Sequence, residues 1–386
     1  MLHLIFPIGS RSGWDICGKY LAIEISKLTD ISLVTSSPIT FDQIGDELEY
    51  CSISRLPINS IDEDYFDRTQ NLLKGVSLRT LNDLDLSIWL GDIRSEITIG
   101  YTFYLGSPLT ELQKASAKNL NIIIAGSSFS EVQLNNAGIE NTRTIIQGIN
   151  PQLFNPSSNL KSLFNDRFVI FSGGKFEFRK GQDIVLRAFK IFSDRHSDAI
   201  LVNSWVNQWD FSLNTMFASC LIDFCFDSKD YVGSMNRLYQ LNGIDPEKVI
   251  TLSIKPSHLL SYIFKNSDIG LFPNRCEGGT NLMLMEYMAC GKPVIATSKT
   301  GHSDIVREEN SFSLKNYGPV STRGDHSSEY PGWVEPDIEE ILDHLETAYN
   351  DPDLCKKKGE AAGESLSELT WQKSALEFYQ TTREFL

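Results

Sequence analysis

The alternation of apolar and polar positions predicts short buried strands followed by helices along most of the chain. Apolar runs that predict strands occupy residues 2–6, 31–35, 86–90, 97–103, 122–125, 168–171, 199–202, 249–252, 269–272 and 294–296. Apolar residues at helical spacing follow several of these runs, at residues 14–28, 183–193, 230–241, 257–266 and 369–385. Strands that alternate with helices predict parallel sheets, so we expect an α/β fold with two doubly wound, Rossmann-like sheets.

Residues 268–297 carry the clearest pattern of the chain. They predict a buried strand, a tight loop, a helix, a turn and a second buried strand. Pro273 ends the first strand, and Thr280 or Asn281 is placed to cap the first turn of the helix. Gly291 follows the helix and supplies its stop. The helix is apolar nearly all round, which places it in the protein interior.

Glu286 lies in the middle of this apolar helix, where an unpaired carboxylate costs several kcal/mol. One interpretation is that Glu286 pairs with a basic residue elsewhere or reaches a solvent edge. The other is that its hydrogen-bond donors arrive with a ligand. Glu277 and the pair Gly278 and Gly279 favour the second interpretation, because glycines before a helix N-terminus let backbone N–H groups approach an anion closely.

A second glycine loop, residues 172–183, follows the strand predicted at residues 168–171. It contains Gly174, Lys175 and Lys180, together with a third basic residue. Backbone amides that approach closely and lysines that supply point charges suit a diphosphate. The alternative is a solvated basic turn without a ligand.

A third loop, residues 7–13, lies between the first strand and the first helix and ends at Gly13. Open parallel sheets bind ligands at this end of their strands, although such a loop is often only a turn. The loop lacks the dinucleotide fingerprint, which gives a nicotinamide enzyme little support.

Composition narrows the classes of function. The formal net charge of −15 argues against nucleic-acid binding and against a polybasic membrane patch. Residues 62–64 form an acidic stretch that we expect at the surface. The seven cysteines indicate free thiols in a reducing compartment, and the scattered histidines predict no metal site. With no signal peptide and no apolar run of about 18 residues, the expected location is the cytoplasm and no transmembrane segment is expected.

Residues 268–297 resemble the donor-site signature of family 4 retaining glycosyltransferases of the GT-B fold, the glycosyl transferases group 1. In that family two glutamates bracket a glycine loop, and the second precedes a Met-Ala-Cys-Gly-x-Pro-Val-Ile run, here residues 288–295. The usual spacing encloses seven residues, whereas Glu277 and Glu286 enclose eight. The loop 172–183 resembles the family's other donor motif. Lys180 occupies the position of the motif's lysine, and Lys175 occupies the position where arginine is usual.

The resemblance implies two Rossmann-like domains that face a cleft, with a C-terminal helix that crosses back to the first domain. The expected boundaries are 1–155 for the N-terminal, acceptor-side domain and 156–365 for the C-terminal domain that holds the nucleotide-sugar donor. Residues 366–386 are the expected returning helix. Residues 150–159, rich in Pro, Asn and Ser, are the expected linker.

The resemblance also implies a metal-independent, retaining glycosyltransferase that moves a sugar from a nucleotide diphosphate sugar to a hydroxyl acceptor, in glycan, glycolipid or polysaccharide biosynthesis. Lys175 and Lys180 stabilise the leaving diphosphate, Glu277 acts near the sugar, and Glu286 accepts the ribose hydroxyls. The expected donor-binding residues are Gly13, Gly174, Lys175, Lys180, Gly278, Gly279, Thr280, Asn281 and Glu286. No cofactor is expected besides the sugar nucleotide, which is a co-substrate.

One departure from the family keeps a second hypothesis open. Many family members have a histidine in the N-terminal domain that reaches into the cleft, but no histidine lies between His3 and His196. The leaving phosphate can accept the acceptor's proton, so catalysis does not require that histidine. The alternative is a catalytically silent GT-B subunit that binds nucleotide and partners with an active enzyme in a glycosyltransferase complex. An epimerase is disfavoured, because it would need several acid or base residues in the cleft.

Overall fold

The computed structural model describes residues 1–36, 38–60, 72–157, 163–207, 209–324 and 330–386. Contacts within it separate two compact units. Unit 1 comprises Met1–Gly148, Gly278–Leu282 and Leu369–Leu386, and unit 2 comprises Ile149–Glu277 and Met283–Glu368. The boundaries expected from the sequence, 1–155, 156–365 and 366–386, stay a prediction. The acidic stretch 62–64 and the last two residues of the expected linker lie outside the described residues.

Unit 1 is built on a parallel sheet with the strand order β3-β2-β1-β4-β5-β6-β7. Its strands are β1 (Leu2–Ile5), β2 (Ile31–Thr35), β3 (Ile58–Ser60), β4 (Leu72–Thr80), β5 (Arg94–Thr102), β6 (Ile122–Ala125) and β7 (Thr142–Thr144). The chain runs outward from β1 to β3 and then returns to the other side of β1 to form β4. The direction of winding therefore reverses between β1 and β4, which makes this a topological switch point.

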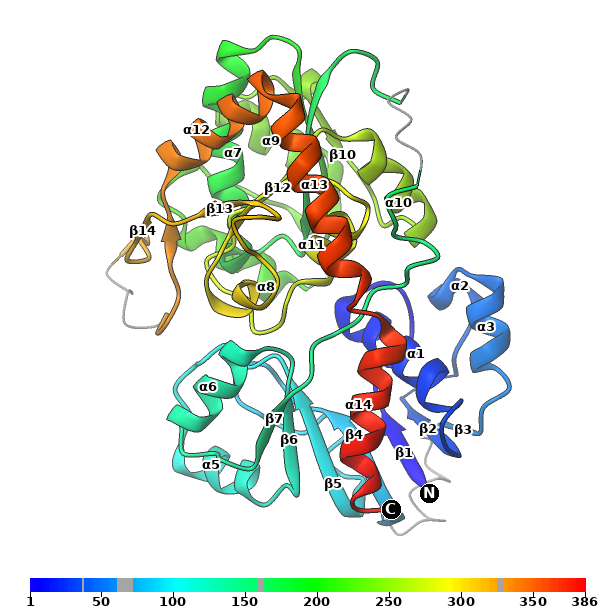
Figure 1. Cartoon of the computed structure of the whole chain (residues 1–386). Coiled ribbons are helices and arrows are strands. Elements are labelled where there is room, and N and C mark those ends of the chain that lie inside the picture. Colours follow the sequence, from blue (N-terminus) through cyan, green and yellow to red (C-terminus); the bar gives the residue numbers. More distant parts are fainter. Residues whose placement is uncertain (37, 61–71, 158–162, 208, 325–329) are drawn as a thin grey trace. The chain divides into compact units, whose positions relative to one another are not determined.

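The helices of unit 1 include the last helix of the chain. They are α1 (Gly13–Ile25), α2 (Phe41–Ile44), α3 (Glu47–Ile53), α5 (Glu111–Lys118), α6 (Ser128–Asn136) and α14 (Trp371–Arg383). The helix α14 lies beside α1 (Figure 1), where the rings of Tyr20 and Trp371 stack with centroids 5.3 Å apart. Phe378 of α14 also packs against Tyr101, at 4.9 Å. The predicted return of the C-terminal helix to the first domain is confirmed.

Unit 2 is built on a second parallel sheet, with the order β10-β9-β8-β11-β12-β13. Its strands are β8 (Phe168–Gly174), β9 (Ala199–Trp205), β10 (Val249–Thr251), β11 (Ile269–Phe272), β12 (Val294–Thr297) and β13 (Phe312–Leu314), with a small antiparallel pair β14 (Tyr317–Gly318) and β15 (Glu335–Pro336). The winding reverses between β8 and β11. Two doubly wound parallel sheets confirm the predicted α/β fold class.

Helices connect the strands of unit 2. The α-helices are α7 (Gln182–Arg195), α8 (Asp210–Leu213), α9 (Tyr231–Leu241), α10 (Ser257–Asn266), α11 (Leu282–Ala289), α12 (Ile338–Asn350) and α13 (Pro352–Ser367). The 3₁₀ turns are η1 (Phe178–Lys180), η2 (Asn214–Ala218), η3 (Ser228–Asp230), η4 (Pro246–Lys248) and η5 (Thr300–Asp304). The core between helices and sheet is aromatic in part, since Phe176 stacks on Trp205 with centroids 5.6 Å apart.

One of the predicted strands is wrong. Residues 86–90 do not form a strand, although Ile88 makes an isolated bridge to Leu81. Leu86 and Leu90 take left-handed backbone conformations, with φ of 60° and 54°, which a strand excludes. The strand between β1 and β5 is instead β4, which the sequence analysis did not find.

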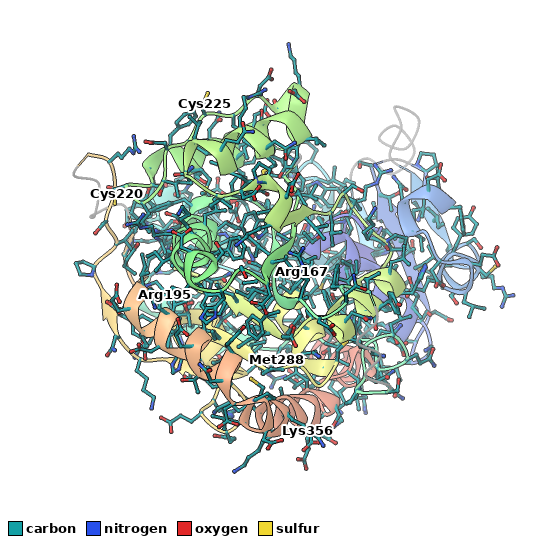
Figure 2. All side chains as sticks on the ribbon, turned by 90° about the horizontal axis from the view of Figure 1, so that it is seen from above. Arg167, Arg195, Cys220, Cys225, Met288 and Lys356 are labelled. Atoms are coloured by element: carbon teal, nitrogen blue, oxygen red, sulfur yellow. The ribbon has the colours of Figure 1, made fainter. Side chains whose placement is uncertain are left out.

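All seven cysteines are free thiols. Cys220 and Cys225 lie at the surface of unit 2, as the labels in Figure 2 show, while Cys17, Cys276 and Cys290 are buried. Among the residues that the structure describes, no helix is both long enough and apolar enough to cross a membrane.

Candidate functional site

The basic loop and the first glutamate of the sequence motifs meet at the switch point of unit 2. The strands β8 and β11 are neighbours there, with Ile170 paired to Ile269. Lys175 follows β8 directly, and Glu277 lies in the loop after β11. Because the carboxyl ends of parallel strands share one edge of the sheet, the two loops lie together where doubly wound sheets bind ligands.

Glu277 is held by cations of the β8–α7 loop. Its Oε1 lies 2.5 Å from the Nζ of Lys180, and its Oε2 lies 2.8 Å from the Nη1 of Arg179. Asn274 donates a further hydrogen bond to Oε1. The backbone N–H of Glu277 donates to the hydroxyl of Thr300 at 3.0 Å. The side chain of Glu277 is 5% exposed, so this carboxylate is fixed in one position by buried, charge-assisted hydrogen bonds.

Charges around Glu277 set the ionisation of the cluster. Burial alone would raise the pKa of Glu277, but Lys180 and Arg179 outweigh it and hold that pKa at about 2. Burial lowers the pKa of Lys180, and Glu277 opposes that shift only in part. His302 is fully buried nearby, and its burial lowers its pKa to about 4, so its imidazole is neutral at pH 7.

Lys175 joins the cluster through Glu177. The Nζ of Lys175 lies 3.4 Å from Oε2 of Glu177, whose Oε1 lies 2.7 Å from Nε of Arg179. The same Nζ stands 5.1 Å from the ring centroid of Trp209, a residue to which the sequence analysis assigned no role. The structure therefore brings Lys175, Lys180 and Glu277 into one cluster, with Arg179 and Glu177 between them.

Arg179, like Glu177, belongs to this cluster but was not selected from the sequence. It occupies η1, directly before Lys180, and bridges both glutamates. The third basic residue of the loop was visible in the sequence, but its partner Glu277 is 98 positions away. In the family motif Lys175 stands where arginine is usual. In the fold, the guanidinium that contacts Glu277 comes from Arg179 instead.

A buried arginine fixes the two loops to each other. The Nη1 and Nη2 of Arg275 lie 2.7 and 2.8 Å from the carboxylate oxygens of Asp183 at the start of α7. Its Nε donates to Glu335 at 2.6 Å, and its Nη1 also donates to the carbonyl of Phe178 at 2.8 Å. The side chain of Arg275 is 0% exposed. These hydrogen bonds to Phe178 and Asp183 fix the backbone on both sides of Arg179 and Lys180.

Two glycines shape the loop after β8. Gly174 has φ +123°, and a Cβ there would lie 3.7 Å from Cδ of Lys180. Gly181 has φ +71°, and a Cβ there would lie only 2.3 Å from the carbonyl oxygen of Pro273. Side chains are therefore disfavoured at both positions, and at Gly181 the neighbouring loop leaves no room for one.

The glycine pair after Glu277 is grouped with unit 1. A Cβ on Gly278 would lie 1.8 Å from the carbonyl oxygen of Phe103, and one on Gly279 would lie 2.6 Å from the ring of Phe103. Ser127 donates a hydrogen bond of 2.6 Å to the carbonyl of Gly278. Close packing against Phe103 thus requires glycine here, whether or not a ligand also approaches these amides.

The remaining predicted residues lie on two helices and the turn before one of them. Thr280 is buried, and Asn281, with φ +65°, directly precedes α11. Glu286 lies in the middle of α11, is 7% exposed and has interaction partners in the structure. Gly13 is exposed at the first position of α1, after the N-cap Ser12.

Among the residues that the structure describes, no three His, Cys, Asp or Glu side chains are grouped so that they could hold a metal ion. The cluster around Glu277 combines buried cations with acidic side chains. Its chemistry suits a polyanion better than a cation.

Comparison with solved structures identifies the architecture. Sucrose-phosphate synthase of Thermosynechococcus elongatus matches with a TM-score of 0.69 and 17% identity over 99% of this chain and 98% of that chain. HepE of Anabaena, solved in complex with UDP and glucose, matches with a TM-score of 0.68 and 15% identity over 99% of both chains. A glycosyltransferase of Rickettsia africae matches with a TM-score of 0.68 and 12% identity over 100% of this chain and 98% of that chain.

The sequence matches cover a smaller part of the chain than the structural matches do. An uncharacterized glycosyltransferase of Methanocaldococcus jannaschii is 24% identical over 179 residues, which are 44% of this chain. The match spans 40% of that relative's length. The family described as glycosyl transferases group 1 matches residues 231–321, which include the loop of Glu277 and the helix of Glu286. The protein therefore has the GT-B fold, and its residues 231–321 match the glycosyl transferases group 1.

Proposed function

We propose that this protein is a glycosyltransferase that moves a hexose from a nucleotide diphosphate sugar to a hydroxyl acceptor. The observation that carries the proposal is the cluster at the β8–β11 switch point of a GT-B fold, where Arg179 and Lys180 pair with Glu277 and Lys175 joins them through Glu177. Cations that point into the ligand-binding edge of a doubly wound sheet suit a leaving diphosphate.

The charge of the cluster supports a diphosphate ligand. Three cations, Lys175, Arg179 and Lys180, face two carboxylates, Glu177 and Glu277, which leaves one net positive charge (3 − 2 = 1). Burial has already lowered the pKa of Lys180, so a phosphate that approaches this ammonium strengthens its charged form. The protein thus offers partly desolvated cations, whose attraction for an anion is stronger than it is in water.

The proposed reaction breaks the bond between the anomeric carbon and the diphosphate oxygen and forms a bond from that carbon to the acceptor oxygen. The acceptor's proton passes to the phosphate oxygen that leaves, so no further base is required. This route delivers the acceptor to the face that the diphosphate vacates and therefore retains the anomeric configuration. Lys175, Arg179 and Lys180 stabilise the charge that develops on the diphosphate.

The two glutamates have separate proposed roles. Glu277 remains a carboxylate at neutral pH because its pKa is held at about 2, which suits it to orient sugar hydroxyls or to stabilise a positive anomeric carbon. Glu286 is buried in α11 and is the proposed acceptor of the ribose hydroxyls. Gly174 and the amides of residues 278–281 are proposed to approach the donor phosphates.

The proposed donor is a uridine diphosphate sugar, because solved structures of HepE contain UDP or UDP-glucose and HepE shares this fold over 99% of the chain. The charge neutralisation is assigned to the basic residues, so the proposed reaction needs no metal ion. The cytoplasm is the proposed compartment, since seven free thiols suit a reducing environment. None of these observations favours a catalytically silent subunit.

The test compares thermal stabilisation by UDP, GDP and ADP and then follows release of nucleoside diphosphate from the matching sugar nucleotides. A ligand at 100 times its dissociation constant adds about 2.7 kcal/mol to the free energy of unfolding, which gives a clear shift. We expect UDP to stabilise the protein most. If none of the three nucleotides shifts the melting temperature, the proposed function is wrong.

A further inference from the structure

Thr300, the first residue of η5, takes a backbone conformation that its side chain disfavours. Its φ is 54°, in the left-handed region, where a Cβ atom crowds the following carbonyl oxygen. A β-branched residue is a genuine outlier there. In the described part of the chain, the other non-glycine residues with positive φ are not branched at Cβ: Leu86, Leu90, Asn165 and Asn281. Strain of this kind persists where the surroundings fix a residue, and it gathers at functional sites.

The backbone of Glu277 provides those surroundings. Its N–H donates to Oγ1 of Thr300 at 3.0 Å, and its carbonyl accepts from the N–H of Gly301 at 2.8 Å. The hydroxyl of Thr300 donates its own hydrogen to the carbonyl of Lys299 at 2.7 Å, so its lone pairs remain for the amide of Glu277. Thr300 is 7% exposed and Glu277 is 4% exposed, which leaves little surface through which water could replace these bonds. The turn η5 therefore holds both polar backbone groups of Glu277.

Different residues hold the carboxylate of Glu277. Lys180, Arg179 and Asn274 contact its oxygens. The two cations are also the groups that the proposed function assigns to the leaving diphosphate, so a bound phosphate competes with Glu277 for them. The contacts of η5 with the backbone of Glu277 involve neither cation, and they remain when the cations pair with a phosphate.

We propose that Thr300 is a positioning residue, which fixes Glu277 against the reacting sugar through its hydroxyl group. The left-handed conformation aims that hydroxyl at the amide of Glu277, and the hydrogen bonds between the two segments offset the strain. The contact between Thr300 and Glu277 lies within unit 2 alone. Its effect on a reacting sugar rests on the proposed function.

A turn with no role beyond structure would respond differently to substitution. If Thr300 only closed the connection after β12, glycine would serve best, because glycine takes the left-handed conformation without strain. Thr300→Ser and Thr300→Ala both keep the Cβ that causes the strain, and they differ from each other by one oxygen atom. This pair separates the hydroxyl from the backbone strain, whereas Thr300→Gly removes both.

The experiment compares these three variants with the wild type in two measurements. Hydrogen exchange, followed by mass spectrometry, reports on the protection of the Glu277 amide and needs no substrate. Turnover of UDP-sugars is measured beside the affinity for UDP. Ser303→Ala is the matched control, because Ser303 is an exposed residue of the same turn and its hydroxyl donates to the carbonyl of Thr300 at 2.7 Å. A double variant of Thr300→Ala and Glu277→Gln tests whether Thr300 acts through Glu277.

We expect the hydroxyl to decide both measurements. In Thr300→Ala and Thr300→Gly the amide of Glu277 should exchange about tenfold faster or more, and kcat should fall about tenfold or more with UDP affinity unchanged. Thr300→Ser should recover most of the protection and most of the turnover, and Ser303→Ala should change neither. In the Glu277→Gln background, Thr300→Ala should lower kcat little further, because the two residues act as a unit.

Equal exchange and equal turnover in Thr300→Ser and Thr300→Ala would overturn the proposal. Three further results would also overturn it: fastest turnover by Thr300→Gly, a loss with Ser303→Ala as large as that with Thr300→Ala, or two full losses that multiply in the double variant. Failure of the proposed function shows separately, as a wild type that transfers sugar from no UDP-sugar. The exchange of the Glu277 amide in the serine and alanine variants then still decides whether Thr300 holds Glu277.

Discussion

At the scale of single residues, the proposed activity depends on the charge balance between Glu277 and its cations. The carboxylate lies within 2.8 Å of both Lys180 and Arg179, and it is almost fully buried. Removal of one partner of a buried ion pair commonly costs about 3–5 kcal/mol, because the other charge is left uncompensated. Glu277 has two cationic partners, so it keeps one when the other is removed. Single substitutions therefore can report on ligand binding without unfolding unit 2.

The first prediction at this scale concerns Lys180→Ala. We expect it to weaken binding of UDP by about 1.5–3 kcal/mol and binding of uridine far less, because only UDP carries the phosphate charge that the ammonium meets. Isothermal titration of both ligands measures the difference. Lys356→Ala, on an exposed side chain of α13 (Figure 2), is the control and should change neither affinity. An equal loss for UDP and uridine would contradict the assignment.

The second prediction concerns His302, whose pKa falls from 6.5 to about 4 on folding. Between these two values the unfolded chain binds more protons than the folded protein, so this residue makes stability rise with pH. The titration of His302 should therefore lower the free energy of unfolding by about 2 kcal/mol when the pH drops from 7 to 5. Urea unfolding at both values, for the wild type and His302→Gln, measures the difference.

The variant His302→Gln should show a smaller loss of stability between pH 7 and pH 5 than the wild type, whatever its absolute stability at pH 7. His3 and His344 also have lowered pKa values, but they contribute equally to both proteins. Equal losses in the wild type and the variant would show that His302 is not held neutral in the fold.

Sequence reasoning reached part of this residue-scale picture. Lys175, Lys180 and Glu277 could be selected because glycines and charged residues directly after apolar runs are visible in one dimension. Arg179 was missed and Arg275 was not considered, because their importance comes from partners about 60 to 98 positions away. Such pairings depend on which strands become neighbours, and that order is set by tertiary packing.

At the scale of elements, the connection from β8 to α7 is the part that positions the cations. Its η1 turn carries Arg179 and Lys180, and Gly181 ends that turn and begins α7. The strand β8 and the following helix were predictable from apolar periodicity. The strand β4 was not, because Gly75 and polar residues interrupt its pattern and a register shift lies between Leu73 and Val76.

A prediction at this scale compares two glycines that share a left-handed conformation. Gly181→Ala places a Cβ 2.3 Å from the carbonyl oxygen of Pro273, whereas Gly45→Ala, with φ +67°, meets nothing within 4 Å. The left-handed conformation alone costs about 1–2 kcal/mol with alanine. Gly181→Ala should therefore cost clearly more stability than Gly45→Ala and should also weaken UDP binding.

Chemical denaturation and UDP titration of both variants measure these effects. Gly45→Ala is the control, because its backbone strain is similar but its surroundings are open. If the two variants lose the same stability and bind UDP equally, the contact between the loops after β8 and β11 does not hold the cluster in place.

At the scale of the whole molecule, two doubly wound sheets and a C-terminal helix in the first unit define the architecture. The alternation of apolar runs and helices predicted both sheets, since each buried strand of a parallel sheet is a short apolar run. The return of α14 to unit 1 came from the resemblance to a family and not from periodicity, because a helix pattern does not show what the helix packs against. The position of α14 is explained by the packing of Trp371 against Tyr20 and of Phe378 against Tyr101.

The measurement that tests the central claim most directly is turnover of UDP-sugars by the wild type and by Glu277→Gln, beside their affinities for UDP. If Glu277 acts on the reacting sugar, the variant should bind UDP nearly as tightly as the wild type but should release UDP from the sugar nucleotide more slowly. Far-ultraviolet circular dichroism at the assay temperature controls for folding. We expect a wild type that transfers sugar and a folded variant that binds nucleotide with lowered turnover. A wild type that binds UDP yet releases no more of it than Glu277→Gln, with every sugar nucleotide and acceptor tried, would contradict the account.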